Sequence, residues 1–400
     1  YGCPQIFFAL ESHIEDITRE MKMDPIEFRK QNLISVGKMD PHSEIVVRTF
    51  GLPECIEKGK QLIKWDEKLE KYKEQKGTKR RGLGMACFSY ASGTYPHGFE
   101  IAGVRIIMNQ DGSVQLQVGA TEIGQGSDTV LSQIAAEVLG LPYDMVHIVS
   151  QQDTDITPFD LGAYASRQTF VSGAAVKKAA EEAKGKALEI AARRTGLSID
   201  ALDIKSARII EKKSGNEICT LEDIAMESYY DLVNAAPIDG NASVNMRTNA
   251  MAYGVTFAEV EVDMETGRIE VVEIYNVHDS GVIINPLLAE GQVHGGVSMS
   301  LGYALSEQML FDPGTGRPLN NNFLDYKLQT IMDTPEIGSA FVQIPEPEGS
   351  VGQKSLGENT TISPAPAVRN AVLNATGIAI NKLPMTPQKV FEEIKKAGLL

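Results

Sequence analysis

The sequence has few cysteines and too little positive charge for several classes of protein. Its four cysteines (Cys3, Cys55, Cys87 and Cys219) are far apart, and none forms a CxxC pair. They therefore indicate neither a zinc site nor an iron–sulfur cluster, and their small number is typical of a reducing cytoplasm. With 53 Asp and Glu residues against 38 Lys and Arg residues, the formal net charge is −15. This excess of negative charge argues against a nucleic-acid-binding surface.

Long apolar runs are also missing. No run reaches the roughly 18 residues of a membrane span, and the N-terminal residues lack a charged-then-apolar signal pattern. We therefore expect a soluble, cytoplasmic protein without membrane contact. The 400 residues can bury a large core and predict two or three domains. Because the first residue is Tyr1 and not Met, we expect that a segment has been removed or lies upstream.

The N-terminal part of the chain predicts helices. Residues 4–22 carry one apolar stripe at helical spacing, and Asp24 followed by Pro25 is typical of a second helix start. Residues 57–81 mix both signs of charge and contain the only tryptophan. We interpret this stretch as a solvated helix with a linker, and we place a domain boundary after residue 78.

Strand patterns follow in two pairs. Apolar residues alternate over 104–108 and 114–118 around a turn at 110–112, and again over 253–262 and 268–277. Both pairs predict hairpins. A helix is then predicted from Asn285, and its repeated glycines (Gly291, Gly295 and Gly296) indicate close approach of another backbone or a ligand.

Two helix starts suit an anion. A Gly-rich turn at residues 119–126 leads from a strand into an apolar helix, and a long Ala-rich helix opens near Ser166, Arg167 and Gln168. Free N–H groups and polar side chains at such starts can bind a phosphate. The alternatives are a turn that binds nothing and Ser166 as an ordinary N-cap. The turn is not GxGxxG and no Walker lysine follows, so we do not expect nucleotide hydrolysis.

The stretch 349–377 contains a carboxylate directly after a glycine, at Gly357-Glu358, and then a helical pattern that Gly377 ends. A carboxylate held in such a turn is a candidate general base, and a solvated surface glutamate is the alternative. His278 and His294 lack a partner at ligand spacing, so neither is expected to bind a metal directly.

Taken together, these motifs resemble the molybdenum-cofactor-binding subunit of the xanthine dehydrogenase/aldehyde oxidoreductase family of molybdenum hydroxylases. The resemblance runs from residue 1 to about residue 395 and covers only the second half of that family's usual large subunit. It rests on six motifs in the family's order: Tyr1-Gly2-Cys3-Pro4-Gln5, Thr121-Glu122-Ile123-Gly124-Gln125-Gly126, Ala165-Ser166-Arg167-Gln168-Thr169, Asn285-Pro286 with Gly291-Gln292-Val293, Lys354-Ser355-Leu356-Gly357-Glu358, and Leu383-Pro384.

The resemblance implies a role for particular residues. Glu358 matches the family's catalytic base. Positions that match contacts to the cofactor are Gly124, Gln125, Gly126, Ala165, Ser166, Arg167, Gln168 and Gln292. Tyr1 matches an aromatic residue of the substrate pocket, and Gly93, Thr94 and Tyr95 fall near its opposite wall. The chain itself would supply no metal ligand, because the pterin dithiolene holds the molybdenum.

The fold implied is α+β, with mixed sheets flanked by helices in an elongated two-part body. Residues 1–78 would be the end of a first molybdenum-cofactor-binding domain plus linker, and residues 79–400 a second such domain. The activity implied is insertion of water-derived oxygen at an electron-poor carbon of an N-heteroaromatic compound, either a purine or a nicotinate-like ring. The alternatives are an aldehyde oxidoreductase, a hydroxybenzoyl-CoA type thioester reductase, and a non-catalytic cofactor-binding scaffold.

The cofactor implied is a molybdopterin-type molybdenum cofactor, with a cytosine dinucleotide form and selenium left open. Partners implied are a chain or segment that supplies the other half of the molybdenum domain, a [2Fe-2S] subunit and an FAD subunit. Some positions depart from the family pattern. Ser355 stands where glycine is usual, His294 where an acidic residue is common, and Gly93 where some purine-oxidising relatives have an aromatic ring.

Overall fold

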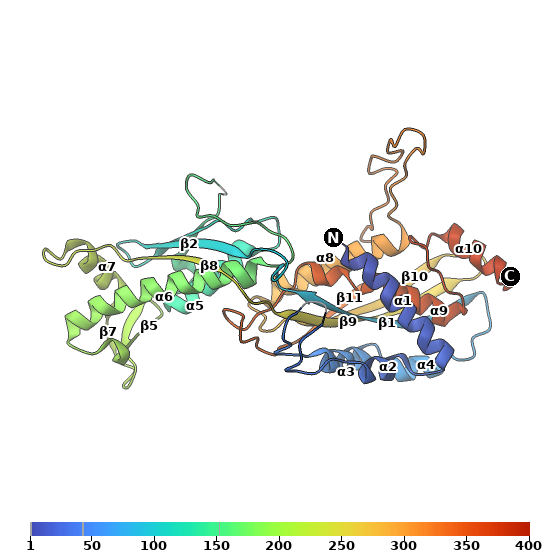
Figure 1. The fold of residues 1–400 in the computed structure, drawn as a ribbon, viewed down its shortest axis with the longest axis horizontal. Helices are drawn as coiled ribbons and strands as arrows, with labels where there is room; N and C mark the ends of the chain where they lie inside the picture. Colours follow the sequence, from blue (N-terminus) through green and yellow to red (C-terminus); the bar gives the residue numbers. More distant parts are fainter. Residues whose placement is uncertain (1, 42–43, 152) are drawn as a thin grey trace.

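The chain forms two lobes that lie end to end along the long axis of the molecule (Figure 1). The structure, a computed structural model, describes residues 2–41, 44–151 and 153–400. Of these described residues, the larger lobe contains those up to residue 91 and those from residue 251, and the smaller lobe contains those between 101 and 245. The chain passes from the larger to the smaller lobe through residues 92–100 and returns through residues 246–250.

The larger lobe is built on a four-stranded sheet with the order β1-β9-β10-β11. Its strands are β1 (Lys79–Ala91), β9 (Met251–Asp263), β10 (Ile269–Asp279) and β11 (Glu336–Val342). β1 and β9 pair antiparallel from Lys79 opposite Asp263 to Ala91 opposite Met251, whereas β10 and β11 are parallel. β9 and β10 form the second predicted hairpin, which is therefore confirmed.

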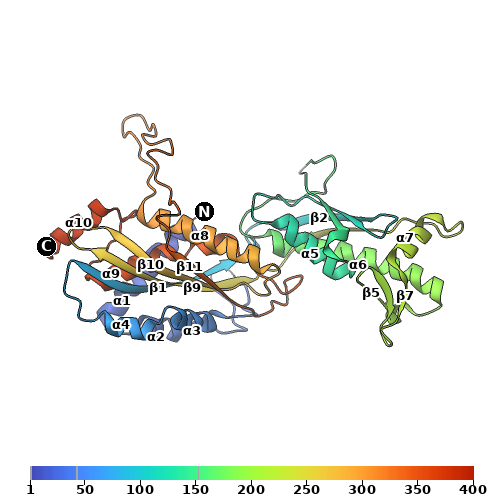
Figure 2. The same ribbon diagram turned by 180° about the vertical axis from the view of Figure 1, so that it is seen from behind.

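Helices cover both faces of this sheet (Figure 2). One core contains apolar side chains of α1 (Cys3–Met21), α8 (Pro286–Leu305), α9 (Pro364–Thr376) and α10 (Pro387–Lys396). The other core contains those of α2 (Pro25–Gln31), α3 (Leu52–Leu62) and α4 (Trp65–Lys71). α9 lies directly on β1 because Gly84 has no side chain: a Cβ there would meet the Ala367 carbonyl oxygen at 2.2 Å.

Part of the charged stretch 57–81 is buried, in contrast to the solvated helix that its composition predicts. Trp65 is buried and its ring contacts that of Phe257 edge to face at 5.3 Å. Lysines and glutamates of α3 and α4 occupy the outer surface, and the indole occupies the inner one. α3 and β1 pack in the same core on either side of residue 78, and the domain boundary there stays a prediction.

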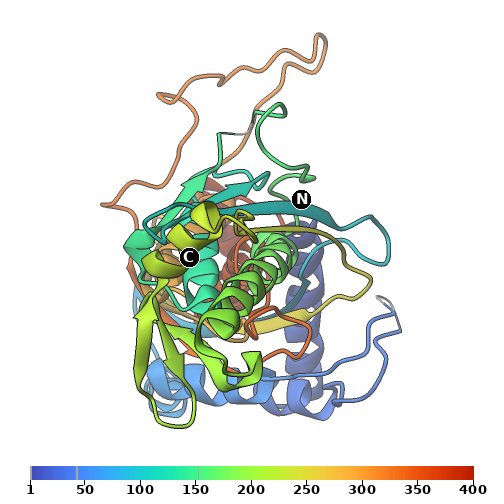
Figure 3. The same cartoon turned by 90° about the vertical axis from the view of Figure 1, so that its left-hand side faces the viewer.

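The smaller lobe has a second four-stranded sheet with the order β4-β3-β2-β8. Its strands are β2 (Ile101–Met108), β3 (Val114–Val118), β4 (Val146–Val149) and β8 (Asp239–Asn245), and β2 and β3 form the first predicted hairpin. Two helices, α5 (Ser127–Leu139) and α6 (Gln168–Thr195), pack against it in a separate core. Figure 3 views this lobe end-on.

A small sheet and a helix stand at the far end of the smaller lobe. They are β5 (Leu202–Lys205), β6 (Arg208–Glu211), β7 (Glu217–Thr220) and α7 (Leu221–Tyr230). Parallel and antiparallel pairs occur together in the large sheets, and helices flank both. The predicted α+β fold with mixed sheets in an elongated two-part body is thus confirmed. Among the described residues, no helix is long and apolar enough to cross a membrane.

Candidate active site

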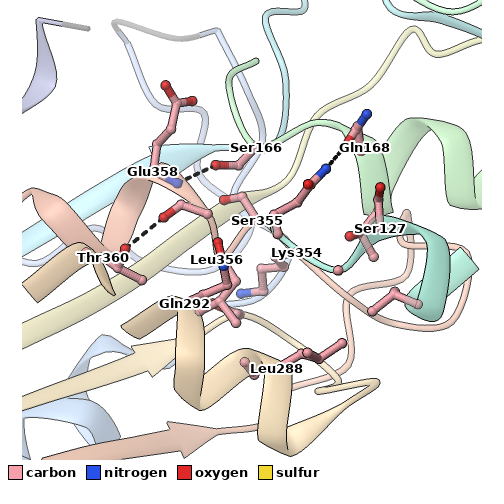
Figure 4. Close-up of a pocket in the computed structure, with 18 of the residues that line it drawn as sticks. Ser127, Ser166, Gln168, Leu288, Gln292, Lys354, Ser355, Leu356, Glu358 and Thr360 are labelled. Atoms are coloured by element: carbon pink, nitrogen blue, oxygen red, sulfur yellow. Dashed lines mark hydrogen bonds between the residues drawn. The ribbon is translucent and has the colours of Figure 1, made fainter. Parts of the chain in front are cut away.

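A cleft of about 590 Å³ lies between the two lobes. The smaller lobe contributes the starts of α5 and α6, and the larger lobe contributes α8 and the segment 353–361 (Figure 4). Seven residues that the sequence assigns to a site line this cleft: Gln125, Gly126, Ser166, Arg167, Gln168, Gln292 and Glu358. The fold therefore brings together motifs that are far apart in the sequence.

Glu358 is held at the cleft wall by groups from two other segments. It begins the short 3-10 helix η3 (Glu358–Thr361), and its backbone N–H donates to the Ser166 hydroxyl at 2.8 Å (Figure 4). The Tyr90 hydroxyl donates to its Oε2. Burial raises the pKa of the Cys3 thiol nearby, and the charge of Glu358 adds to this effect, so Cys3 stays neutral. A half-buried carboxylate with fixed neighbours is suited to exchanging a proton with a ligand in the cleft.

The backbone at Ala165 and Ser166 is strained. Their φ angles are 45° and 49°, in the left-handed region, which costs a non-glycine residue about 1–3 kcal/mol each. The Gly93 N–H donates to the Ala165 carbonyl at 2.9 Å, and the Ser166 hydroxyl accepts from Glu358. Ser166 is therefore not the N-cap of α6, which begins after Arg167 without a side-chain cap. Strain of this kind is concentrated at functional sites, where surrounding contacts maintain it.

The Arg167 side chain is held by other groups of this chain. Its guanidinium is fully buried and donates to the carboxylates of Glu100 and Asp160 and to the carbonyls of Gly162 and Ile101. Both carboxylates are also buried. These two carboxylates already neutralise its charge, and a contact between Arg167 and an anionic ligand stays a prediction. Arg167 anchors the strained turn before α6.

In the turn before α5, the carboxylate of a residue of the turn itself occupies the place of an anionic ligand. The Glu122 carboxylate accepts hydrogen bonds from the backbone N–H groups of Gly124, Gly126 and Asp128 and from the Ser127 hydroxyl. Burial opposes its ionisation, but these hydrogen bonds outweigh burial and hold the pKa of Glu122 below its usual value. The sequence predicted free N–H groups at this turn, but those of Gly124, Gly126 and Asp128 already donate to Glu122. Gly124 is exposed and does not line the cleft, whereas Gly126 does.

Amide side chains form a polar part of the wall. The Gln125 Nε2 donates to the Gln168 Oε1 and to the Thr121 carbonyl, which also accepts from the Gln168 Nε2. Figure 4 shows this contact beside the start of α6. Gln292 projects from α8 on the larger lobe. These amides can donate to and accept from the edge of a heterocyclic ligand.

Residues to which the sequence assigned no role lie at the floor of the cleft and just behind it. Lys354 and Asp279 form a fully buried ion pair at 2.7 Å. The hydroxyls of Ser280 and Ser355 are buried, and neither has a hydrogen-bond partner among the described residues. Tyr90 was missed as well. Ser355 lies inside a quoted motif and departs from its usual glycine, which was the available signal for it.

Of the four predicted substrate-pocket residues, the structure places Gly93, Thr94 and Tyr95 away from the cleft lining. Tyr1 falls outside the described residues. Gly93 and Thr94 lie behind the strained turn, where the Thr94 N–H and hydroxyl donate to Glu100. The Tyr95 carbonyl accepts from Asn249. None of the three lines the cleft as it stands, and their role at a substrate stays a prediction.

Comparison with known proteins gives a consistent answer. The family model described as "Molybdopterin cofactor-binding domain" matches residues 58–335. The xanthine dehydrogenase molybdenum-binding subunit of Escherichia coli O157:H7 is 45% identical over 401 residues, which cover 100% of this chain and 53% of the relative. The chain thus spans about half the length of the curated relatives that it matches.

Solved structures agree. A reconstituted CO dehydrogenase from Oligotropha carboxidovorans has a TM-score of 0.90 at 25% identity, over 99% of this chain and 52% of that one. An aldehyde oxidoreductase from Desulfovibrio gigas has a TM-score of 0.80 at 26% identity, over 99% of this chain and 41% of that one. The chain belongs to the molybdopterin cofactor-binding family and, within it, to the molybdenum-binding subunits of the xanthine dehydrogenase family.

Proposed function

We propose that this chain forms one side of the molybdenum site of a hydroxylase that inserts water-derived oxygen at an electron-poor carbon of an N-heteroaromatic compound. The observation that carries the proposal is the position of Glu358, a carboxylate fixed by Tyr90 and Ser166 at the wall of an interlobe cleft. The similarity to a xanthine dehydrogenase subunit supports a purine or a nicotinate-like ring as substrate.

The residues of the cleft fit a molybdopterin. Amides of Gln125, Gln168 and Gln292 face a cleft whose floor contains the unpartnered hydroxyls of Ser280 and Ser355. Buried polar groups of this kind are normally satisfied, and the donors and acceptors at the edge of a pterin would satisfy them. When bound, the cofactor supplies the oxygen-transfer chemistry and accepts the electrons. Within the described residues, no group of three His, Cys, Asp or Glu side chains can hold a metal ion directly.

Glu358 would handle the proton in this reaction. Its carboxylate would accept a proton at the point where water-derived oxygen is activated, and a general base of this kind typically contributes 10²–10⁴-fold to the rate. Tyr90 and Ser166 would keep the side chain and backbone of Glu358 in place. Apolar residues of α8, Leu288 and Met299, would form the wall against which a flat ring packs.

Electrons would leave through other chains. The cysteines here are isolated and free, so an iron–sulfur cluster has no ligand set among the described residues. We propose a [2Fe-2S] subunit and an FAD subunit as partners, together with the complementary half of the molybdenum-binding subunit. A cytosine dinucleotide form of the cofactor and a cytoplasmic location, which free cysteines favour, belong to the same proposal.

The test is a substrate panel assayed on the assembled complex with an artificial electron acceptor. We expect purines or nicotinate to turn over, and Glu358→Gln to lower kcat by at least about 100-fold because it removes only the base. Glu290→Gln is the control, since that carboxylate lies half-exposed on α8 outside the cleft. Activity of Glu358→Gln within a few-fold of the native complex would refute the assignment.

The same panel separates the alternatives. Turnover of aldehydes alone would favour an aldehyde oxidoreductase, a reading supported by the likeness to the Desulfovibrio gigas structure. Reduction of an aromatic thioester would favour the reductase alternative. A complex that contains molybdenum but turns over none of these compounds would favour a non-catalytic scaffold.

A further inference from the structure

A long arm projects from the larger lobe. It comprises residues 306–335, between α8 and β11, and contains neither a helix nor a strand of its own among its described residues (Figure 1). Its base is fixed: the Ser306 hydroxyl donates to the Lys327 carbonyl at 2.8 Å, and the Tyr326 hydroxyl donates to Glu307 at 2.7 Å. Hydrogen bonds therefore hold the base of the arm, while the rest of it projects away from the larger lobe.

The arm carries large apolar side chains on its surface. Phe311, Leu319, Phe323, Leu324, Ile331 and Met332 are all exposed. Ile331 and Met332 are 90% and 89% exposed, so almost none of their surface is covered by the rest of the chain. Several large apolar side chains exposed on one segment point to an interaction site, because water contact with them is unfavourable.

The arm is joined to the helix that forms one wall of the cleft. It follows α8 without a break, and α8 contributes Leu288 and Met299 to the cleft wall. Met299 is itself 66% exposed. On the smaller lobe, a second projection with exposed Ile156 and Phe159 rises on the same side of the molecule (Figures 1, 2 and 3). One partner that closes the cleft would therefore reach the arm and both lobes.

We propose that the arm is the docking element for the complementary half of the molybdenum-binding subunit. The inference rests on the proposed function, because it takes the same missing half as its occupant. The curated relative is nearly twice as long as this chain, so in that relative a similar length of polypeptide is available to cover this side. A second copy of this chain is disfavoured by charge: each copy carries −15, and the arm itself has more acidic than basic residues.

The experiment measures binding and not turnover, so that loss of docking and failure of the proposed chemistry give different results. This chain is mixed with the polypeptide that corresponds to the remaining part of the relatives' subunit, and Kd is measured. Two arm variants are compared, Phe323→Asp with Leu324→Asp and, separately, Ile331→Asp with Met332→Asp. The control is Leu232→Asp with Val233→Asp, an adjacent pair that is equally exposed but lies at the far end of the smaller lobe.

We expect each arm variant to weaken binding by about 100-fold or more, because two anchoring side chains lose their apolar contacts, and the control to bind like the native chain. Circular dichroism should show unchanged folding, since the arm lies outside the apolar cores. Equal binding by the arm variants and the native chain would overturn the proposal. So would a dimer of this chain alone that the arm variants abolish, because the arm would then serve a second copy.

Discussion

His278 is a buried base without a partner. It lies fully buried on β10 between the rings of Phe88 and Phe341, with centroids at 5.2 and 6.2 Å. Neither ring nitrogen has a hydrogen-bond partner among the described residues. Burial disfavours the charged imidazolium and lowers the pKa of His278 to about 3. The native protein therefore keeps this histidine neutral at every pH at which it is normally handled.

This burial predicts a loss of stability in mild acid. Between pH 6.5 and pH 3 the unfolded chain binds a proton at His278 and the native chain does not, so stability falls as pH decreases through this window. We expect His278→Leu to reduce the loss in unfolding free energy between pH 7 and pH 5 by about 2 kcal/mol. Urea unfolding at both pH values measures it. His294→Leu, at a side chain 45% exposed, should behave like the native chain; the same loss in His278→Leu would contradict this account.

At the scale of elements, the packing of α8 against η3 positions Glu358. Gly296 on α8 faces Thr360, and a Cβ at residue 296 would stand 1.9 Å from the Thr360 Oγ1. The neighbouring Gly295 has open space: nothing lies within 4 Å of its Cβ position. The two adjacent glycines therefore separate a packing effect from a helix-propensity effect.

We expect opposite results from the two alanine variants. Gly295→Ala should raise the free energy of unfolding by about 0.5–1 kcal/mol, because alanine loses less backbone entropy in a helix. Gly296→Ala should lower it by about 1–3 kcal/mol, because the added methyl group overpacks the contact with η3. Urea unfolding of both variants provides the measurement. A stabilised Gly296→Ala would show that η3 can move away at no cost.

The elements themselves were largely predictable from local signals. The apolar stripe of α1, the Asp24 cap, the two hairpins and the glycine after α9 each depend on residues close in sequence. Asp24, for example, accepts from the N–H groups of Ile26 and Glu27, as its position before Pro25 predicts. Close approach at the glycines of α8 was also correct for Gly296.

The partners of the site residues were less predictable, because they come from distant segments. Arg167 was expected to meet a ligand, and only the folded chain brings Glu100 beside it. Glu122 was overlooked as the acceptor at its own turn, although Gly124 and Gly126, whose N–H groups donate to it, are only two and four residues away. Trp65 was placed in a solvated stretch because its neighbours are charged, whereas one buried face suffices for an indole.

At the scale of the whole molecule, the cleft depends on how the lobes meet. Bonds between the lobes converge on the segment 349–358 and the start of α8. The Gln353 Nε2 donates to the Thr169 carbonyl at 2.7 Å, and Lys177 donates to the Ser350 carbonyl at 2.8 Å. Ile284 and Val351 of the larger lobe also pack against the apolar core of the smaller lobe, so polar and apolar contacts together join the lobes beside the cleft.

The charge of the cleft predicts how the chain behaves alone. Among the described residues that line it, the only cationic side chains are Arg167 and Lys354, and buried carboxylates already neutralise both. A cofactor phosphate that enters this cleft would lack a counter-charge, and burying an anion without one is costly. The complementary half must then supply positive charge or donors to the phosphate.

We therefore expect the chain expressed alone to retain little molybdenum and the assembled complex to contain about one atom per copy. Metal analysis by mass spectrometry after gel filtration measures both samples, and pterin fluorescence after oxidation gives a readout that does not depend on the metal. Lys354→Met tests whether the chain's own positive charge holds the cofactor. Because Lys354 is paired with Asp279, its removal should lower the stability of the protein. Cofactor retention by the isolated chain should stay as low as before. Stoichiometric molybdenum in the isolated native chain would contradict this prediction, because the cleft alone would then supply enough hydrogen-bond donors for the phosphate.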